Sequence, residues 1–367
     1  MRNVRHPGRT PIIMQHLAVA DLDHVLAHTR ELWDELRGAR LFITGGTGFF
    51  GCWLLESFAW ACDTLQLGAT ATVLSRSPEA FRKKAPHLAA HSAIRLMQGD
   101  VRGFQFPEGS FTHVIHGATE ASAALNREQP LLMLDTIVDG TRRALDFAAS
   151  SGVKRFLLLS SGAVYGTQPV TLARLAEDYA GGPDTTDPRW VYGEGKRLAE
   201  LLATVYSRQY GFACPIARGF AFVGPHLPLD VHFAIGNFIS DCIHGRSIEI
   251  RGDGTALRSY LYAADLAIWL WTILLRGESC RPYNVGSEQA ISIADLAATA
   301  SEVLDAGQPV KIVRKAAPGA AAERYVPDTS RARNELGLAQ HIPLDEAIRR
   351  TARWHKEPVM VSGEARA

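Results

Sequence analysis

The sequence has no long apolar run and almost no net charge. No uninterrupted hydrophobic stretch reaches the roughly 20 residues that a membrane-spanning helix needs, and the basic N-terminus has no apolar core of signal-peptide length. Lysine and arginine number 39 against 38 aspartates and glutamates, a net charge of +1, and no long basic run is present. We therefore expect a cytoplasmic protein that binds neither a membrane nor a nucleic acid.

Cysteine is scarce and scattered. The five cysteines form no C-x-x-C pair and no cluster with histidine, so the spacing typical of a zinc site is missing and we expect no metal. Isolated thiols of this kind are typical of a reducing compartment. What the chain does have is an ordinary globular composition, 47% hydrophobic and 21% charged over 367 residues. This length allows one large domain with a smaller lobe.

From residue 40 onward, short apolar runs alternate with longer segments of helical periodicity. The expected strands lie at 40–44, 70–75, 94–97, 113–116, 155–160 and 213–218, and the expected helices at 49–66, 131–151 and 190–210. Apolar strands that alternate with helices predict a parallel sheet covered on both faces, which is the doubly wound, Rossmann-type α/β class.

The segments on either side of this pattern differ from it. Residues 17–38 carry apolar side chains at helical spacing, which predicts a helix. After residue 219 the pattern becomes mixed, with an expected hairpin at 248–262 and helices near 292–305 and 343–355. The expected units are therefore a helical extension at 1–39, a dinucleotide-binding domain at 40–218, and a smaller mixed α/β lobe at 219–367 that mainly binds substrate and has an interleaved boundary.

A glycine-rich stretch, LFITGGTGFFG at 41–51, connects the first expected strand to the first expected helix. The first glycine of a G-x-x-G-x-x-G spacing allows a tight turn, the second a close approach to a pyrophosphate, and the third close packing of helix and strand. The helix N-terminus offers N–H groups and a positive dipole end to the phosphates. This context predicts dinucleotide binding through Gly45, Thr47, Gly48, Phe49, Phe50 and Gly51.

The end of the second expected strand bears on which dinucleotide is bound. An acidic residue there would hold the adenosine ribose of NAD, but the chain has Ser75 and Arg76. Serine and arginine suit a 2′-phosphate, so we expect NAD or NADP, with NADP slightly favoured. Two alternatives remain open, that Arg76 stacks on the adenine of NAD or that it is an exposed loop residue.

Tyr192 and Lys196 lie one helical turn apart in RWVYGEGKRLAE (189–200). A helix would place both side chains on one face. Such a pair can be an ordinary solvated stripe, or it can transfer protons. A phenol with a pKa of ~10 is a poor base near neutral pH, and a nearby ammonium lowers that pKa.

Five motifs occur in an order that is typical of one family. They are the glycine loop, QGDV (98–101), VIHGAT (114–119), LLLSSGAVYG (157–166) and YGEGK (192–196). Over about residues 40–355 the chain thus resembles the extended short-chain dehydrogenase/reductases, and more narrowly the NAD-dependent epimerase/dehydratase family acting on nucleotide sugars. The resemblance implies an enzyme that takes a nucleotide-diphosphate sugar and forms a homodimer.

The resemblance also implies roles for individual residues. Tyr192 would be the catalytic acid/base, Lys196 would hold the nicotinamide ribose, and Ser161 would steady the reacting oxygen. Both Tyr192 and Lys196 would thereby contact the cofactor. Four further cofactor contacts are implied, from Asp100 and Val101 at the adenine and from Gly117 and Ala118 beside the pyrophosphate and nicotinamide ribose.

Substrate contacts are implied less closely. Arg258, in GDGTALRSYLYAAD (252–265), takes the place of an arginine that binds the substrate diphosphate, with Ser259 where the family has aspartate. A guanidinium is well matched to phosphate by its fork of donors. The other implied substrate contacts are Ser161, Asn237, Glu120 and Ser122. The chain departs from the family at three more positions, namely Gly195 for serine or alanine, Ile137 for asparagine, and Ala221 for the asparagine at the sugar nucleotide.

One pair of residues bears on the reaction. Sugar-nucleotide 4,6-dehydratases carry Asp-Glu directly after the active-site threonine, and decarboxylases also place a glutamate there, but this chain has Gly162 and Ala163. Neither residue transfers protons. We therefore expect a 4-epimerase or 4-ketoreductase, with a dehydratase or decarboxylase as the alternative. A non-catalytic dinucleotide-binding protein is less favoured, because Ser161, Tyr192 and Lys196 are all present.

Overall fold

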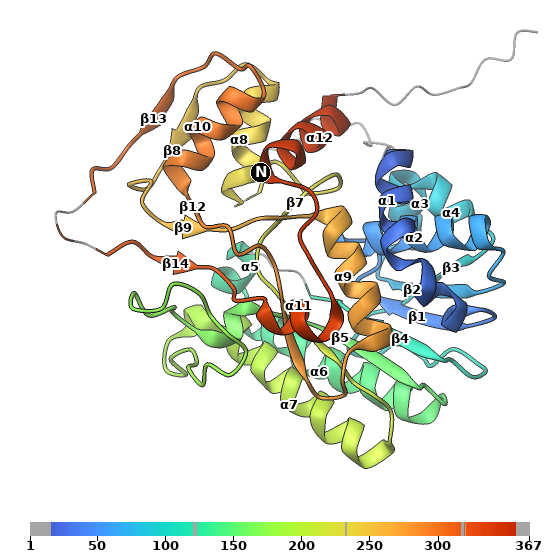
Figure 1. The fold of residues 1–367 in the computed structure, drawn as a ribbon. Helices are drawn as coiled ribbons and strands as arrows, with labels where there is room; N and C mark the ends of the chain where they lie inside the picture. The colour runs from blue at the N-terminus through green and yellow to red at the C-terminus, as the bar shows by residue number, and fades with distance from the viewer. Residues whose placement is uncertain (1–15, 120–122, 232, 317–318, 320, 357–367) are drawn as a thin grey trace, which may run out of the picture.

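Seven parallel strands form the centre of the molecule (Figure 1). The computed structural model describes residues 16–119, 123–231, 233–316, 319 and 321–356. The sheet has the order β11-β6-β5-β4-β1-β2-β3, which is the Rossmann order with one added edge strand. Its strands are β1 (Arg40–Thr44), β2 (Thr70–Ser75), β3 (Ile94–Gln98), β4 (His113–His116), β5 (Arg155–Ser161), β6 (Ile216–Gly219) and β11 (Pro282–Val285). The predicted doubly wound α/β class is confirmed.

The sixth expected strand begins three residues later than the sequence pattern indicated. Pro215 has no N–H to donate to a ladder, so β6 begins at Ile216. The carbonyls of Ala213 and Pro215 still accept hydrogen bonds from Phe156 and Leu158 of β5. The approach to the strand therefore lies along the sheet without being part of it.

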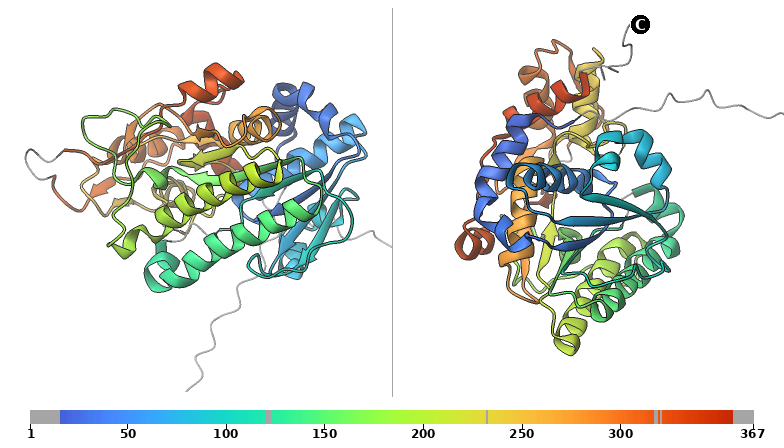
Figure 2. Two further views of the ribbon diagram at one scale, coloured as in Figure 1. Left: turned by 90° about the horizontal axis from the view of Figure 1, so that it is seen from below. Right: turned by 90° about the vertical axis from the view of Figure 1, so that its right-hand side faces the viewer.

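Helices cover both faces of the sheet (Figure 2). On one face lie α2 (Phe49–Leu65) and α9 (Ala263–Arg276), which share one hydrophobic core. On the other lie α6 (Pro130–Ser150) and α7 (Val191–Tyr210), which pack against each other over a second core. The three helices expected at 49–66, 131–151 and 190–210 are thus confirmed to within one residue at each end. The short helices α3 (Pro78–Lys84), α4 (Pro86–Ala90) and α5 (Ala123–Glu128) were not anticipated.

The N-terminal segment packs on the same face as α2 and α9 (Figure 1). It forms α1 (Val19–Thr29) followed by the 3-10 helix η1 (Arg30–Leu36), where one continuous helix was expected. The rings of Trp33 and Trp271 lie 4.9 Å apart, and the Tyr262 hydroxyl donates to Asp21 at 2.6 Å. These contacts place the segment in the main hydrophobic core.

The remaining chain forms a lobe at the carboxyl edge of the sheet. Its helices are α8 (Ala234–Ile243), α10 (Ile293–Val303) and α12 (Leu344–Lys356), whereas α11 (Ser330–Leu336) packs against β11 and α9 of the sheet domain. Its strands are β7 (Phe222–Val223), β8 (Ile248–Ile250), β9 (Leu257–Arg258), β10 (Leu261–Tyr262), β12 (Ile291–Ser292), β13 (Val310–Ile312) and β14 (Arg324–Tyr325). The helices expected near 292–305 and 343–355 are present. None of the helices in the described residues is long and apolar enough to span a membrane.

The expected hairpin at 248–262 is wrong. Instead, β8 pairs with β13, β9 pairs with β12 and β14, and β10 pairs with β7. The turn itself exists, because Asp253 accepts hydrogen bonds from the N–H and hydroxyl of Thr255 at 3.0 and 2.8 Å. The strands on its two sides diverge to distant partners, so a correct local turn did not determine strand pairing.

Candidate active site

The glycine loop closes tightly on the neighbouring loop of the sheet. Gly45 has φ +76°, and a Cβ added there would lie 2.5 Å from the carbonyl carbon and oxygen of Gly117. A Cβ on Gly51 would lie 2.4 Å from the Cα of Gly46. Gly48, by contrast, has no backbone atom closer than 3.5 Å to such a Cβ and stands as the N-cap of α2 without a side-chain cap. The turn and the packing glycines are therefore sterically required, and the helix end is open to an anion.

The loops after β1 and β4 meet where the strand order reverses. The hydroxyl of Thr44 accepts hydrogen bonds from the N–H groups of Gly117 and Ala118, each at 3.2 Å, and lies 2.8 Å from His116 Nδ1. Burial lowers the pKa of His116 to about 3, so the ring is neutral and its Nε2 pairs with Thr141 at 3.0 Å. The crevice at such a reversal is where doubly wound sheets bind ligands.

Ser75, Arg76 and Asp100 lie at the outer end of this crevice. Ser75 is buried and its hydroxyl accepts from the N–H of Ser77, whereas Arg76 is exposed. A hydrogen-bonded ion pair with Arg102 at 2.9 Å, with a smaller contribution from the charge of Arg76, lowers the pKa of Asp100. Val101 is buried against α6, with a methyl group 2.8 Å from the position of a Cβ on Gly140.

The structure brings Ser161, Tyr192 and Lys196 together. Ser161 ends β5, and its hydroxyl accepts from the N–H of Ala163 at the start of the 3-10 helix η2 (Gly162–Tyr165). Burial raises the pKa of Tyr192, and a hydrogen bond with Ser161 lowers it in part. Lys196 Nζ lies 5.9 Å from the Tyr192 ring centroid on the same face of α7. The two side chains therefore lie on one face of the helix, as the four-residue spacing predicted, while their role in proton transfer stays a prediction.

Lys196 is held in place by neighbours that sequence reasoning missed. Its ammonium donates to the carbonyl of Leu159 at 2.9 Å and to the Thr119 hydroxyl at 3.2 Å, with only 4% of the residue exposed. Burial lowers the pKa of Lys196 to about 8, opposed by the charge of Glu200. Glu200 itself forms a 2.7 Å ion pair with Arg218. Glu200 follows Lys196 by four residues, or about one helical turn, and this spacing could have predicted that the two side chains lie on the same face of the helix.

Tyr325 enters the site from the lobe and was also missed. It lies on β14, directly opposite Arg258 of β9. A Cβ on Gly162 would lie 2.7 Å from the Tyr325 hydroxyl and 2.8 Å from the Phe220 ring. Burial raises the pKa of Tyr325, and a hydrogen bond with Ser161 opposes that rise. Its hydroxyl is therefore a third one beside those of Ser161 and Tyr192.

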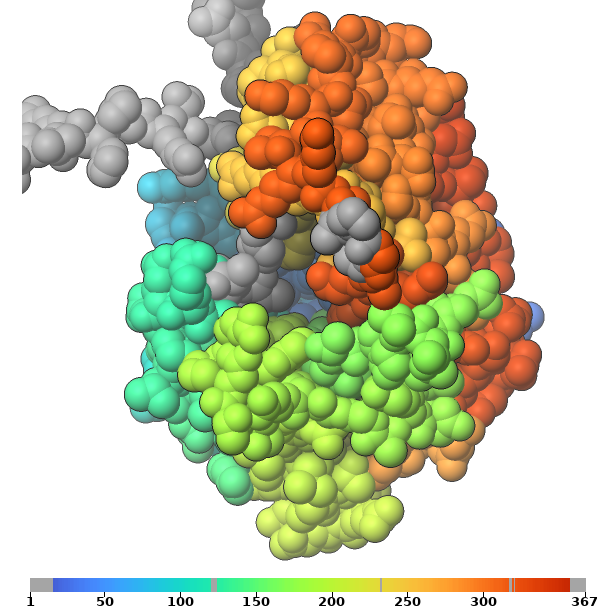
Figure 3. Space-filling model, turned by 90° about the vertical axis from the view of Figure 1, so that its left-hand side faces the viewer, coloured from blue at the N-terminus to red at the C-terminus, as the bar shows by residue number. Residues whose placement is uncertain are grey.

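The other expected substrate contacts are placed unequally. Arg258 donates to Glu323 at 2.7 Å and pairs in register with Tyr325, the residue whose hydroxyl lies beside Gly162. Asn237 is half-buried on α8 of the lobe. Glu120 and Ser122 lie outside the described residues. Figure 3 shows a hollow between the green segment that follows β5 and the orange part of the lobe, with blue atoms of the early chain at its floor.

Two departures from the family pattern face each other. A Cβ on Gly195 would lie 3.1 Å from Ile137 Cδ1, so the isoleucine of α6 occupies the space beside the glycine of α7. The larger Ile137, in place of the family's asparagine, thus accompanies the smaller Gly195, in place of serine or alanine. The helix contact is preserved, and the face that carries Tyr192 and Lys196 stays packed on α6.

The sequence matches a known protein family and several curated proteins. The model of the NAD dependent epimerase/dehydratase family matches residues 41–286. UDP-glucuronic acid decarboxylase 1 of Arabidopsis thaliana is 30% identical over 85% of this chain and 68% of its own length. UDP-glucuronic acid decarboxylase 6 of the same plant is 29% identical over 84% and 86%.

Two solved structures are similar in fold. UDP-glucose 4-epimerase of Thermotoga maritima, with UDP-glucose, has a TM-score of 0.72 at 20% identity and covers 86% of this chain and 98% of its own. The dTDP-glucose 4,6-dehydratase of Streptomyces venezuelae, with NAD bound, has a TM-score of 0.72 at 22% identity, covering 86% and 97%. The fold is shared, whereas the reactions of these relatives differ.

Proposed function

Because this chain belongs to the NAD dependent epimerase/dehydratase family, we propose that it transfers a hydride between a nicotinamide dinucleotide and carbon 4 of the sugar in a nucleotide-diphosphate sugar. The reaction proceeds without loss of water or carbon dioxide, as in a 4-epimerase or 4-ketoreductase. The substrate classes in the names of the relatives support the nucleotide sugar.

The observation that carries this proposal is the filling of the space at Gly162. The Tyr325 hydroxyl and the Phe220 ring lie 2.7 and 2.8 Å from the position of a Cβ there, so a carboxylate side chain would have to displace these rings. Ala163 follows and has no proton to transfer. The region after Ser161 thus lacks the acid and base that elimination of water requires, while the hydroxyls for reversible hydride transfer are present.

The residues divide the chemistry among them. The glycine loop and the open N-terminus of α2 suit a pyrophosphate, and NAD or NADP bound there supplies or accepts the hydride. Tyr192 takes the proton from the sugar hydroxyl during oxidation and returns it during reduction. Ser161 donates a hydrogen bond to the same sugar oxygen, and the positive charge of Lys196 favours the phenolate form of Tyr192.

The lobe holds the remainder of the substrate. Arg258 binds the diphosphate by exchanging its bond with Glu323, which is a largely exposed partner at 66%. An exposed ion pair is weak, so the exchange costs little. Tyr325, opposite Arg258 in the register, places its hydroxyl between the diphosphate side and Ser161. It orients the sugar at the reacting carbon.

We propose that Arg76 gives the site a preference for NADP over NAD. Its exposed guanidinium directly follows β2, and its positive charge contributes to lowering the pKa of Asp100. Arg76 then meets the 2′-phosphate of NADP, a strong charge-assisted contact. NAD binds in the same loop without that contact.

We propose that the chain forms a homodimer through exposed apolar side chains of α7. Leu198, Leu201 and Val205 are 41, 59 and 48% exposed and recur at helical spacing. A second copy of this chain would cover them in a symmetric helix contact. Light scattering should give twice the monomer mass, and Leu201→Glu should return it to the monomer mass. The cytoplasmic location stays a prediction.

Decarboxylation is the second candidate, because the curated relatives named above are UDP-glucuronic acid decarboxylases. One assay separates the candidates. The enzyme is incubated with NAD or NADPH and a panel of UDP-, dTDP-, CDP- and GDP-sugars, including UDP-glucuronic acid and 4-keto-6-deoxy forms, and product mass is followed. An epimer keeps the substrate mass and a reduced product gains two hydrogens. A product lighter by water or carbon dioxide contradicts the proposal, provided Tyr192→Phe suppresses it.

A further inference from the structure

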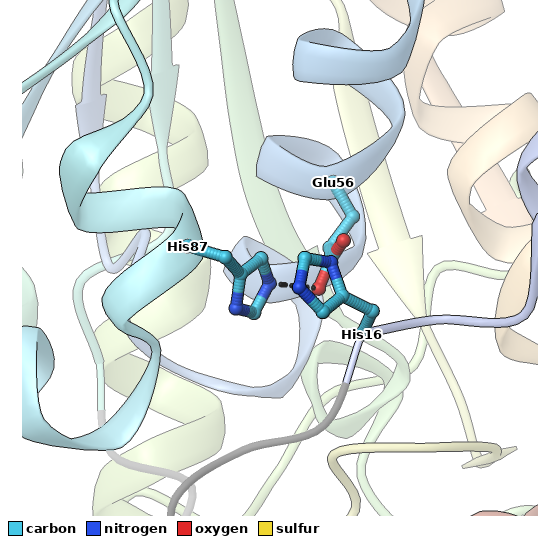
Figure 4. Close-up of side chains that lie close together, drawn as sticks. All are labelled: His16, Glu56 and His87. Atoms are coloured by element: carbon cyan, nitrogen blue, oxygen red, sulfur yellow. Dashed lines mark hydrogen bonds and ion pairs between the residues drawn. The ribbon is translucent and has the colours of Figure 1, made fainter. Parts of the chain in front are cut away.

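A cluster of histidines surrounds one buried carboxylate away from the candidate active site. Glu56, on the middle of α2, is only 4% exposed. His87 Nε2 of α4 lies 2.7 Å from Glu56 Oε1, and His16 precedes α1. The ligand atoms of these three side chains all lie within 4.8 Å of one another. Figure 4 shows the two imidazole rings side by side, with the carboxylate of Glu56 at their nitrogens.

A fourth side chain reaches the same carboxylate. His226 follows β7, its side chain is fully buried, and its Nε2 lies 3.8 Å from Glu56 Oε1. Among the described residues neither ring nitrogen of His226 has a hydrogen-bond partner. A buried polar group without a partner costs about 1–3 kcal/mol, so these nitrogens need an explanation. A cation beside Glu56 would give the nearer nitrogen, Nε2, a partner.

We propose that Glu56, His16, His87 and His226 bind one divalent transition-metal ion of the zinc type. Three imidazoles and one carboxylate are a donor set that such ions prefer over calcium or magnesium. Ligand atoms around a tetrahedral ion stand roughly 3.3 Å apart. The observed distances to Glu56, 2.7 Å from His87 and 3.8 Å from His226, lie on either side of that value. His226 lies outside the group of three side chains whose ligand atoms are all within 4.8 Å of one another, so its ring has to turn toward His16 and His87 to complete the set.

The protonation states suit a metal. Burial lowers the pKa of His16 and of His226, which leaves both rings neutral with a lone pair available. Burial alone would raise the pKa of Glu56, but the neighbouring imidazoles of His226 and His87 outweigh it and keep the carboxylate charged. The site therefore offers an ion one carboxylate together with imidazole nitrogens.

The site would join segments that are distant in the chain. The ligands come from the stretch before α1, from α2, from α4 and from the loop after β7. No local spacing connects them, so a search for cysteine and histidine spacing in the sequence could not detect this group. The ion fastens the N-terminal segment to the sheet domain, so its effect is on stability rather than on hydride transfer.

The test uses the full chain stripped with a chelator and titrated with zinc chloride by calorimetry. We expect one ion per chain with a Kd of about 1 µM or tighter. The midpoint Tm should rise by about 3–4 °C at a hundredfold excess over Kd. Cobalt(II) in the same site should give the visible absorption bands of a four-coordinate ion.

Variants separate this site from adventitious binding. His16→Ala removes an exposed ligand outside any helix or strand and should weaken zinc binding at least about tenfold without unfolding the chain. His28→Ala is the control, since His28 lies with His24 and His341 in another group of imidazoles. It should leave Kd and the Tm shift unchanged. Failure of the wild type to bind zinc, or equal Kd values for wild type and His16→Ala, would overturn the proposal.

Discussion

The proposed dinucleotide side and the proposed substrate side of the candidate site are built in different ways. On the proposed dinucleotide side, backbone meets backbone, since a Cβ added to Gly45 would lie 2.5 Å from the carbonyl group of Gly117. Both loops continue neighbouring strands of one sheet. On the substrate side, Arg258 and Tyr325 project from two-residue strands of the lobe. The first side is determined by main-chain shape, and the second by single functional groups. Substitutions should therefore act differently on the two.

The largest effect is expected where the two sides meet. Tyr192→Phe should lower turnover by ~10²–10⁴-fold, because it removes the only atom proposed to exchange a proton with the sugar. The Kd for the dinucleotide should hardly change, and fluorescence titration measures it. Tyr210→Phe, at the exposed end of the same helix, is the matched control. Normal turnover in Tyr192→Phe would refute the proton-transfer role.

The next effect separates the substrate side from the dinucleotide side. Arg258→Ala should weaken binding of the nucleotide-diphosphate sugar by about 1.5–3 kcal/mol, the range for a charged hydrogen bond, and leave dinucleotide affinity unchanged. Calorimetry with each ligand measures both. Arg251→Ala, an exposed arginine near by in the chain, should change neither. If Arg258→Ala weakens both ligands alike, the division into two sides does not hold.

A similar effect is expected for the other arginine, with the ligands reversed. Arg76→Ala should weaken NADP(H) by about 1.5–3 kcal/mol and hardly affect NAD(H), since only the 2′-phosphate is lost as a partner. Arg82→Ala, on α3, controls for the general loss of a surface charge. Equal losses for both dinucleotides would indicate adenine stacking instead.

A smaller effect tests whether Tyr325 belongs to the site. Tyr325→Phe removes one hydroxyl beside Ser161. The resulting fall in kcat/KM should correspond to a rise of about 0.5–1.5 kcal/mol in activation free energy, which is the usual contribution of one hydrogen bond. Tyr206→Phe also loses a hydroxyl bond, to Asp146 at 2.7 Å, but lies far along α7. It should leave kcat/KM unchanged. The same loss in both variants would mean that Tyr325 acts only through stability.

The smallest effect concerns the helix pair behind Tyr192 and Lys196. Gly195→Ala gains ~1 kcal/mol of helix propensity. Its Cβ, however, would press on Ile137 Cδ1 at 3.1 Å, so the single variant should change the free energy of unfolding by less than that gain. Ile137→Val removes the Cδ1 atom. Urea unfolding of both single variants and the double variant should then show Gly195→Ala as more stabilising in the valine background. Simple additivity would rule out the contact.

The sequence by itself determined the features that depend on local order. Strand runs, helical periodicity and the glycine loop are set by neighbouring residues, and they identified the parallel sheet and its first turn. The four-residue step from Tyr192 to Lys196 likewise needs only a helix to place both on one face. Family resemblance added Ser161, which the fold then brought to within hydrogen-bonding reach of Tyr192.

Only the tertiary structure decided the contacts between distant segments. Tyr325 reaches Ser161 because β14 pairs with β9 across the lobe, and the hairpin expected from the local turn never forms. His226 reaches Glu56 from a separate loop in the same way. Such contacts depend on which strands pair and which helices pack, and these choices are governed by burial over the whole chain rather than by spacing within one segment.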